Sequence, residues 1–332
     1  MRRQPKVALI GGGSWATAIA KMLTNNVDEL HWWVRSKDIA QHLHLNGQNP
    51  RYLSSVHLDP KQLIVDTDLK RVIEQCDIIF MCVPSAYIFK TFDGLNIKGM
   101  QKKVIISCVK GIIPEYHSIP ARYIHKEFGT PYDQIGIVCG PCHAEEVAQE
   151  KLSYVTVACS DENVADQVAD LLKTRYVKTN TSDDLFGTEL SAVMKNIYAL
   201  AAGICHGLRY GDNFMAVLMA NAIRETERFV DAVNQVHRDV KSSAYLGDLL
   251  VTAYSQFSRN RTFGTMIGQG YSVKSAQIEL NMVAEGYYAV KSVMEINKKF
   301  NVDIPIVEAV YNVLYERIAP AIEIRILADK LT

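Results

Sequence analysis

The stretch from Leu185 to Gly207 has helical periodicity and carries one cation on an unusual face. Its apolar stripe consists of residues three or four positions apart: Leu190, Val193, Met194, Ile197, Leu200, Ala201 and Ile204. The opposite face would be charged if it met water, yet it holds small or neutral residues and Lys195. Burial or a second cation would lower the pKa of this amine toward neutrality, where it can exchange a proton with a substrate. A structural lysine paired with Glu189 or Asp248 explains the pattern equally well.

A second group of residues has the chemistry of an anion site. Asp248 and Thr252 lie one helical turn apart in a predicted helix, and Ser258-Arg259-Asn260 follows it. A guanidinium grips a phosphate through two parallel hydrogen bonds, while a hydroxyl and an amide add neutral donors. The alternative is a solvated helix C-terminus at which Arg259 compensates the dipole.

Lys110 follows a predicted strand, Lys103–Cys108, in the sequence Val109-Lys110-Gly111. A lysine at the carboxyl end of a parallel strand points toward the crevice in which ligands of such sheets bind. An ordinary surface lysine on a loop is the other interpretation.

A glycine-rich loop joins the first predicted strand to a helix. Gly11 permits a tight turn, Gly13 lets the backbone approach a pyrophosphate, and Ala16 lets the helix pack closely on the strand. The pattern is weak alone, but here it opens a series of alternating strands and helices, which favours dinucleotide binding over a simple turn or a methyltransferase-type loop. After the second strand, Arg35 stands where NAD enzymes carry an acid, which favours NADP(H) over NAD(H) unless Arg35 and Lys37 are only surface cations.

The segment Cys139-Gly140-Pro141-Cys142 has the C-x-x-C spacing of a redox motif. It lies deep within the predicted sheet, however, so a strand end, a turn and a helix start are the simpler interpretation, with a regulatory disulfide left open. The histidines and cysteines show no metal-ligand spacing, so no metal is expected.

The elements that position these residues divide the chain into two predicted domains. Short strands alternate with helices up to about residue 180, which predicts a doubly wound α/β sheet of largely parallel strands in residues 1–185. The expected strands are Lys6–Ile10, Leu30–Val34, Asp77–Val83, Lys103–Cys108, Gln134–Cys139, Tyr154–Cys159 and Tyr176–Thr179. After about residue 185 the periodicity is only helical, in 185–207, 214–234, 246–257, 272–300 and 306–318, and the second domain is expected to comprise residues 186–332. An all-helical second domain is therefore predicted, with a cleft between the two.

Composition sets further bounds. The chain has 332 residues, and its 36 Lys and Arg balance 36 Asp and Glu, so no global charge attracts nucleic acid. No apolar run is long enough for stable membrane insertion, and Met1–Lys6 lacks a signal-peptide core. Seven cysteines scattered through apolar segments are typical of reduced interior residues, so a cytoplasmic location is expected.

These motifs together resemble the bacterial NAD(P)-dependent glycerol-3-phosphate dehydrogenase family. The matching segments occur in the family's order and spacing: Gly11–Ala16, Cys82–Ser85, Val109–Gly111, Gly140–Ala148, Glu189-Leu190, Lys195-Asn196, Gly247–Leu249, Ser258–Asn260 and Ala284–Gly286. The resemblance implies a Rossmann-type domain and a helical domain of the 6-phosphogluconate-dehydrogenase-like kind. It also implies reversible reduction of dihydroxyacetone phosphate to sn-glycerol 3-phosphate for phospholipid synthesis, by a homodimer.

Residue roles follow from the resemblance by position. It makes Lys195 the proton donor and acceptor, and the other catalytic residues are Lys110, Asp248, Asn196 and Thr252. The implied cofactor contacts are Gly11, Gly13, Ser14, Trp15, Arg35, Lys110, Ala144, Arg259, Val283 and Glu285. The implied contacts to the phosphorylated substrate are Lys110, Gly140, Cys142, Lys195, Asp248, Ser258, Arg259 and Asn260. The chain departs from the family at Cys142, where serine is usual, and at His143, where phenylalanine is common.

Three other functions fit parts of the sequence. A dehydrogenase of the 6-phosphogluconate or ketopantoate type would share the domain order but not Ser258-Arg259-Asn260. A non-catalytic nucleotide sensor would not need Lys195, Lys110 and Asp248 together. A disulfide oxidoreductase would need the C-x-x-C segment as its active site.

Overall fold

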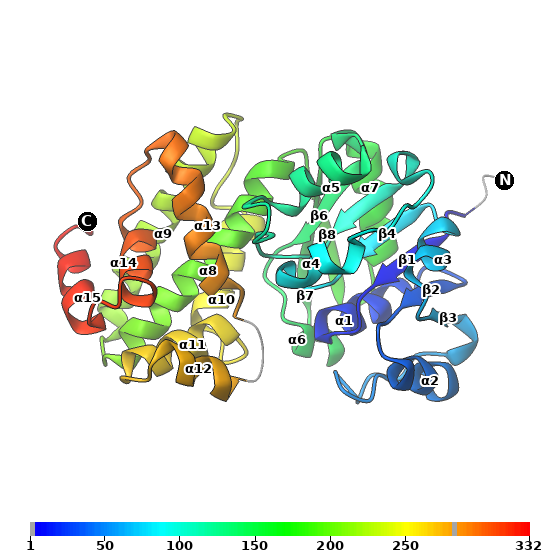
Figure 1. Ribbon diagram of the computed structural model, residues 1–332, viewed down its shortest axis with the longest axis horizontal. Coiled ribbons are helices and arrows are strands. Elements are labelled where there is room, and N and C mark those ends of the chain that lie inside the picture. Colours follow the sequence, from blue (N-terminus) through cyan, green and yellow to red (C-terminus); the bar gives the residue numbers. More distant parts are fainter. Residues whose placement is uncertain (1–3, 281–283) are drawn as a thin grey trace. The chain divides into compact units, whose positions relative to one another are not determined.

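The computed structural model describes residues 4–280 and 284–332, and it divides into two compact units (Figure 1). Unit 1 comprises residues up to Val109 together with Pro120–Leu185. Unit 2 comprises Lys110–Ile119 and Phe186–Thr332. The segment 110–119 belongs to the helical unit, so Lys110 lies in unit 2.

Unit 1 contains one eight-stranded sheet with the order β3-β2-β1-β4-β5-β6-β7-β8. Its strands are β1 (Val7–Ile10), β2 (Leu30–Trp33), β3 (Leu63–Asp66), β4 (Ile78–Met81), β5 (Val104–Ser107), β6 (Ile135–Cys139), β7 (Ser153–Cys159) and β8 (Val177–Ser182). The first six strands in this spatial order, β3 to β6, form the doubly wound order of a dinucleotide-binding fold, as predicted.

Two features of the sheet differ from the expectation. The strand β3 was not predicted, because Leu63-Ile64-Val65 is a short apolar run at the sheet edge and Ile64 is 38% exposed. The pair β6 and β7 is antiparallel rather than parallel. Only the five-residue helix α6 (Ala144–Ala148) lies between them, and an antiparallel pair needs no long crossover.

Helices pack on the sheet because its central strands are apolar on both faces. The strands β1, β2 and β4 are buried at every position. Contacts join α1 (Ser14–Leu23) to α6 and to α7 (Glu162–Leu172), and they join α7 to the last two strands. The other helices of unit 1 are α2 (Lys37–Asn46), α3 (Leu69–Glu74), α4 (Ser85–Phe92) and α5 (Pro120–Phe128).

Unit 2 is helical over its described residues, apart from one isolated bridge between Ile113 and Ser118. Its helices are α8 (Leu185–Gly207), α9 (Asp212–Val233), α10 (Asp248–Tyr254), α11 (Arg259–Gly268), α12 (Val273–Leu280), α13 (Glu285–Phe300), α14 (Pro305–Leu314) and α15 (Pro320–Ala328). The predicted α8 is confirmed in full, while α11 and α15 were not anticipated as separate helices. None of the helices over 4–280 and 284–332 is long and apolar enough to cross a membrane.

The small residues on the second face of α8 are explained by the close approach of α11. A Cβ atom added to Gly203 would lie 2.1 Å from the carbonyl oxygen of Arg261, and one added to Gly264 would lie 2.2 Å from that of Leu200. The two backbones therefore touch, and only glycine fits at the crossing. This contact places the start of α11 beside the middle of α8, where Lys195 and Asn196 lie.

Candidate functional site

The glycine-rich loop of unit 1 joins β1 to α1 as expected. Gly11 has φ +131°, and a Cβ there would lie 2.7 Å from the carbonyl oxygen of Cys82. Both the backbone conformation and this steric clash therefore exclude a side chain at this position. Gly13 precedes α1, and nothing lies within 4 Å of the position its Cβ would take. The backbone is thus open to a ligand at the N-terminus of α1, where free N–H groups favour phosphate. These residues fit the pyrophosphate of a dinucleotide.

Two residues that sequence reasoning missed hold this loop in place. Trp32 donates from Nε1 to the carbonyl oxygen of Gly11 at 2.6 Å. The buried amide of Asn49 donates to the carbonyl oxygen of Gly12 and to Oγ1 of Thr17, each at 3.0 Å. No linear motif marks either residue, because the contacts join segments 21 to 37 positions apart.

The other expected cofactor residues of unit 1 lie around the same sheet edge. Ser14 and Trp15 are the first two residues of α1 and are half-buried. Arg35 is exposed and lies just after β2. It follows the buried Val34 and precedes Ser36, the residue that caps α2. An exposed guanidinium at this position suits a 2′-phosphate better than a bare ribose hydroxyl.

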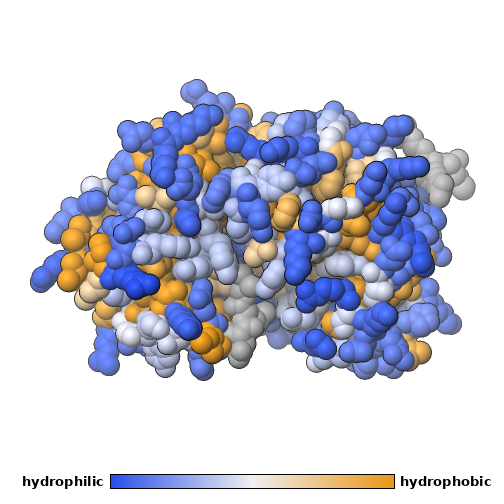
Figure 2. Space-filling model, viewed as in Figure 1, coloured by the Kyte–Doolittle hydropathy of each residue, from blue (hydrophilic) through white to orange (hydrophobic). Residues whose placement is uncertain are grey.

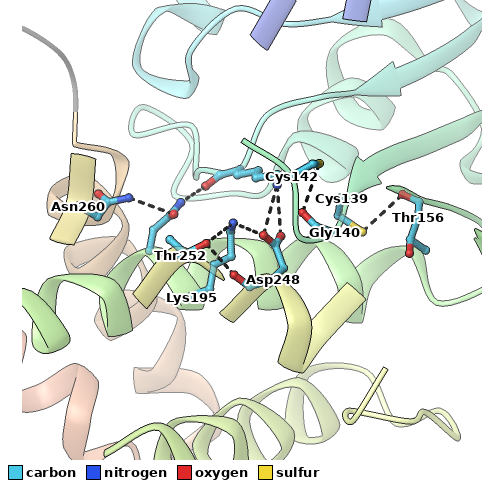
Figure 3. Close-up of polar contacts among 10 residues, drawn as sticks. Cys139, Gly140, Cys142, Thr156, Lys195, Asp248, Thr252 and Asn260 are labelled. Carbon is cyan, nitrogen blue, oxygen red and sulfur yellow. Dashed lines mark hydrogen bonds and ion pairs between the residues drawn. The ribbon is translucent and has the colours of Figure 1, made fainter. Parts of the chain in front are cut away.

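Unit 2 contains a buried ionic cluster formed by Lys110, Lys195, Asp248 and Thr252 (Figure 3). The Nζ atom of Lys195 lies 2.5 Å from Oδ1 of Asp248 and 2.8 Å from Oγ1 of Thr252. The Nζ atom of Lys110 lies 3.2 Å from Oδ2 of the same carboxylate. The predicted pairing of Lys195 with Asp248 is therefore present, together with the second cation.

Asp248 is held as a carboxylate within this cluster. Burial raises its pKa, but the attraction and hydrogen bonds of Lys110 and Lys195 outweigh this effect, so the pKa lies below its ordinary value. Its side chain is 2% exposed and that of Lys195 is 6% exposed. Two cations contact this one carboxylate, an arrangement that favours an anionic ligand or a developing oxyanion.

Local structure explains where Asp248 lies. One π-helical turn, Ser243–Gly247, runs directly into α10, and Asp248 is the first residue of that helix. Thr252 follows one turn later, and its hydroxyl donates to the carbonyl oxygen of Asp248 at 2.6 Å. This hydroxyl therefore accepts the hydrogen bond from Lys195, which fixes its orientation.

A chain of amides connects the cluster to α11 and α13. Asn196 donates from Nδ2 to the carbonyl oxygen of Lys110 at 2.6 Å, and Asn260 donates to Oδ1 of Asn196 at 3.0 Å. The backbone N–H of Gly286 in turn donates to Oδ1 of Asn260 at 2.9 Å. Asn196 and Asn260 thus fix the positions of the Lys110 segment, α8, α11 and α13 relative to one another.

Ser258 and Arg259 begin a helix rather than end one. Ser258 caps α11, since its hydroxyl accepts from the N–H of Arg261 at 3.3 Å, and Arg259 is exposed at the first position. The solvated helix C-terminus considered from the sequence is therefore wrong. Glu285 is half-buried at the start of α13, and the expected cofactor contact Val283 lies outside the described residues.

The C-x-x-C segment is a turn between β6 and α6. The Sγ atom of Cys139 donates to the carbonyl oxygen of Thr156, and that of Cys142 to the carbonyl oxygen of Gly140 (Figure 3). Gly140 has φ +111°, and a Cβ there would lie 2.9 Å from the carbonyl oxygen of Tyr154. Ala144 begins α6. Strand end, turn and helix start occur as in the simpler interpretation.

Known proteins resemble the chain over almost its whole length. Family models for the N-terminus and the C-terminus of NAD-dependent glycerol-3-phosphate dehydrogenase match residues 6–165 and 184–325. A glycerol-3-phosphate dehydrogenase (NAD(P)+) of Staphylococcus aureus is 36% identical over 315 residues, which cover 95% of each chain.

Solved structures agree with these matches. The glycerol-3-phosphate dehydrogenase of Coxiella burnetii is 28% identical, with a TM-score of 0.88 over 98% of each chain. The enzyme of Saccharomyces cerevisiae shares the fold at 24% identity and a TM-score of 0.81. Because both halves match the family models and a relative at 36% identity covers 95% of the chain, the protein belongs to the NAD-dependent glycerol-3-phosphate dehydrogenase family.

Proposed function

We propose that this protein catalyses the reversible NAD(P)H-dependent reduction of dihydroxyacetone phosphate to sn-glycerol 3-phosphate, which supplies the backbone of phospholipids. The observation that carries the proposal is the buried contact of Lys195 with Asp248 and Thr252, in a chain whose two halves match this family. Reduction of a ketone needs a hydride and a proton. The nicotinamide supplies the hydride when it is bound, and the protein must deliver the proton.

Lys195 is the proposed proton donor. Asp248 and Thr252 hold its ammonium group from two sides, so the donor is fixed in one orientation before the substrate arrives. The amine gives a proton to the oxygen at C2 as that oxygen becomes an alkoxide, and it takes the proton back in the oxidation of glycerol phosphate. Lys110 adds positive charge near the same carboxylate and stabilises the developing oxyanion.

The phosphate group of the substrate is assigned to Arg259 with Ser258 and Asn260. Arg259 is exposed at the N-terminus of α11, where its guanidinium and the helix N-terminus both favour an anion. Asn260 also keeps α11 attached to Asn196 beside Lys195. Gly140 and Cys142 remain predicted substrate contacts, through a thiol or the backbone where the family has a serine hydroxyl.

The dinucleotide is assigned to unit 1, with its pyrophosphate on Gly11, Gly13 and the start of α1. Ser14 and Trp15 lie at the same helix end, and Arg35 favours NADPH. Ala144, Lys110, Arg259 and Glu285 remain predicted cofactor contacts.

We also propose a cytoplasmic homodimer that associates through the helical unit. Ile278 on α12 and Ile322 and Ile326 on α15 are 66%, 57% and 47% exposed. Part of the orange surface at the left of Figure 2 lies over α15. A contiguous patch of apolar side chains, unlike scattered single ones, is typical of a surface that a partner covers.

The direct test follows absorbance at 340 nm with dihydroxyacetone phosphate, using NADH and NADPH in parallel. Oxidation of the cofactor with this ketone, and not with 2-dehydropantoate or another 2-oxoacid, is the expected result. The Lys195→Ala variant serves as the matched protein control. Turnover with a 2-oxoacid alone would assign the protein to a different reaction, and cofactor binding without turnover on any ketone would indicate a nucleotide sensor.

A further inference from the structure

Two cysteines outside the predicted site lie side by side at the carboxyl edge of the sheet. Cys82 and Cys108 directly follow β4 and β5, which are parallel neighbours with Met81 opposite Ser107. The pairing continues one step further, since the N–H of Cys108 donates to the carbonyl oxygen of Met81 at 2.9 Å. The two cysteines are therefore the next pair in register, and the side chains of such a pair point to the same face of the sheet.

The thiol of Cys108 lies close enough to raise the pKa of the Cys82 thiol, and both residues pack against one hydrophobic cluster of unit 1. Neighbouring parallel strands are about 4.8 Å apart, which lies within the Cα separation that a bridge between two sulfurs requires. Cys108 is 4% exposed and Cys82 is half-buried, so Cys82 is the more exposed residue of the pair.

The chemistry of the pair favours a bridging ligand over oxidation. Burial and the neighbouring thiol raise the pKa of Cys82 well above its ordinary value. A protonated thiol reacts slowly with peroxides and disulfides, because the thiolate is the nucleophile in those reactions. Two adjacent protonated thiols can still condense with an electrophile that accepts two sulfurs.

Cys82 also touches the glycine-rich loop. Its N–H donates to the carbonyl oxygen of Ile10 at 2.8 Å, and its own carbonyl oxygen lies where a Cβ on Gly11 would clash. A group attached to Cys82 would therefore be adjacent to the backbone that we assign to the pyrophosphate. We propose that Cys82 and Cys108 form a dithiol site for trivalent organoarsenicals, and that occupation of this site prevents NAD(P)H binding at Gly11–Gly13.

The proposed reaction is a condensation without a redox change. An organoarsenic oxide, R–As=O, reacts with both thiols to give R–As(S-Cys82)(S-Cys108) and one molecule of water. Two S–H bonds break, two As–S bonds form, and the two protons leave on the oxide oxygen. The second As–S bond forms within one molecule, so the pair should bind about 10²-fold or more tightly than a single thiol.

The test uses phenylarsine oxide and the full-length protein. Bound arsenic is measured by native mass spectrometry, and NADPH binding is measured by its fluorescence. Wild type and the control Cys76→Ser, a buried cysteine ahead of β4, should bind one equivalent that a dithiol removes and a monothiol does not. The variants Cys82→Ser, Cys82→Ala and Cys108→Ser should lose this affinity by about 10²-fold. Saturating NADPH should slow the reaction of the wild type.

The alternative dithiol is Cys139 with Cys142, so Cys139→Ser is included. Dithiol-reversible binding that disappears in Cys139→Ser and survives in Cys82→Ser would overturn the proposal. So would arsenical-loaded wild type that keeps its far-UV circular dichroism and still binds NADPH normally. This proposal rests on the proposed cofactor site, and the untreated enzyme distinguishes failure of one from failure of the other. If the enzyme does not bind NADPH without arsenical, the cofactor assignment is refuted. If it binds NADPH equally well with and without arsenical, only the proposed effect of the dithiol site is refuted.

Discussion

The Nζ atom of Lys195 lies 2.5 Å from Oδ1 of Asp248, which is 53 residues further along the chain. Both side chains are buried, and the same ammonium group donates to Thr252. A buried cation held in this way combines two properties that catalysis needs, a fixed position and a proton to give. Removal of one member of a buried ion pair is costly for stability, so variants at the two ends of this contact should separate chemistry from stability.

Removal of the amine should affect turnover most. We expect Lys195→Ala to lower kcat by about 10²–10⁴-fold, because the alkoxide would lose its proton donor. NADPH binding should change little, because the glycine-rich loop belongs to unit 1. Steady-state kinetics and fluorescence titration of NADPH measure the two effects. A variant with near-normal kcat would remove Lys195 from the chemistry.

Removal of the carboxylate should affect stability in a pH-dependent way. Asp248→Asn removes the carboxylate that the ammonium groups of Lys110 and Lys195 both contact, so we expect a loss of about 3–5 kcal/mol in the free energy of unfolding at pH 7. The pKa of Asp248 is depressed in the folded protein. The stabilisation is therefore present above the unfolded pKa of about 3.9 and is lost as the pH falls through the lower folded pKa.

Urea unfolding of wild type and Asp248→Asn at several pH values checks this prediction. The difference between the two proteins should be constant between about pH 5 and 7 and should shrink below about pH 4. A difference that grows on acidification, or none at pH 7, would contradict a carboxylate held between two cations.

The amide chain predicts that Asn260 positions neighbouring segments in addition to its proposed contact with the substrate phosphate. Asn260→Ala leaves the N–H of Gly286 and Oδ1 of Asn196 without their partner, at a cost of about 1–3 kcal/mol. Because Asn196 also holds the backbone of Lys110, the KM for dihydroxyacetone phosphate should rise as well. Asn221→Ala, which removes exposed hydrogen bonds on α9, is the control and should leave both quantities near wild type. A stable Asn260→Ala with unchanged KM would refute this role.

The close crossing of α8 and α11 predicts a large effect of one methyl group. Gly203→Ala would place a Cβ 2.1 Å from the carbonyl oxygen of Arg261, so the helices must separate and stability should fall by about 1–3 kcal/mol or more. Gly211→Ala is the matched control, because nothing lies within 4 Å of its Cβ position, and it should cost about 1 kcal/mol or less at a helix N-cap. Thermal unfolding of both variants makes the comparison, and equal losses would contradict backbone contact at the crossing.

The sequence was most informative where a contiguous stretch of residues determines the local structure. The long apolar stripe and small face of α8 predicted both the helix and a close neighbour, and β1 with Gly11 and Gly13 predicted the loop. The sequence contained no signal where the structure depends on contacts between residues that are far apart in the chain. Nothing near Asn49 or Trp32 indicates that they hold that loop, and Ser258 was not recognised as a helix cap because the apolar pattern of α11 is interrupted by glycines. The edge strand β3 depends on pairing with β2, which no local signal specifies.

Arg35 should determine which dinucleotide is preferred. Its exposed guanidinium follows β2, where a 2′-phosphate would accept charged hydrogen bonds worth about 1.5–3 kcal/mol. Arg35→Gln should therefore raise the KM for NADPH by about 10–100-fold and leave the KM for NADH within about twofold. Lys37→Gln, also exposed and two residues further on, shows whether a neighbouring cation shares the role. Parallel changes in both KM values would mean that Arg35 does not read the 2′-position, and an unchanged NADPH KM would remove it from the cofactor site.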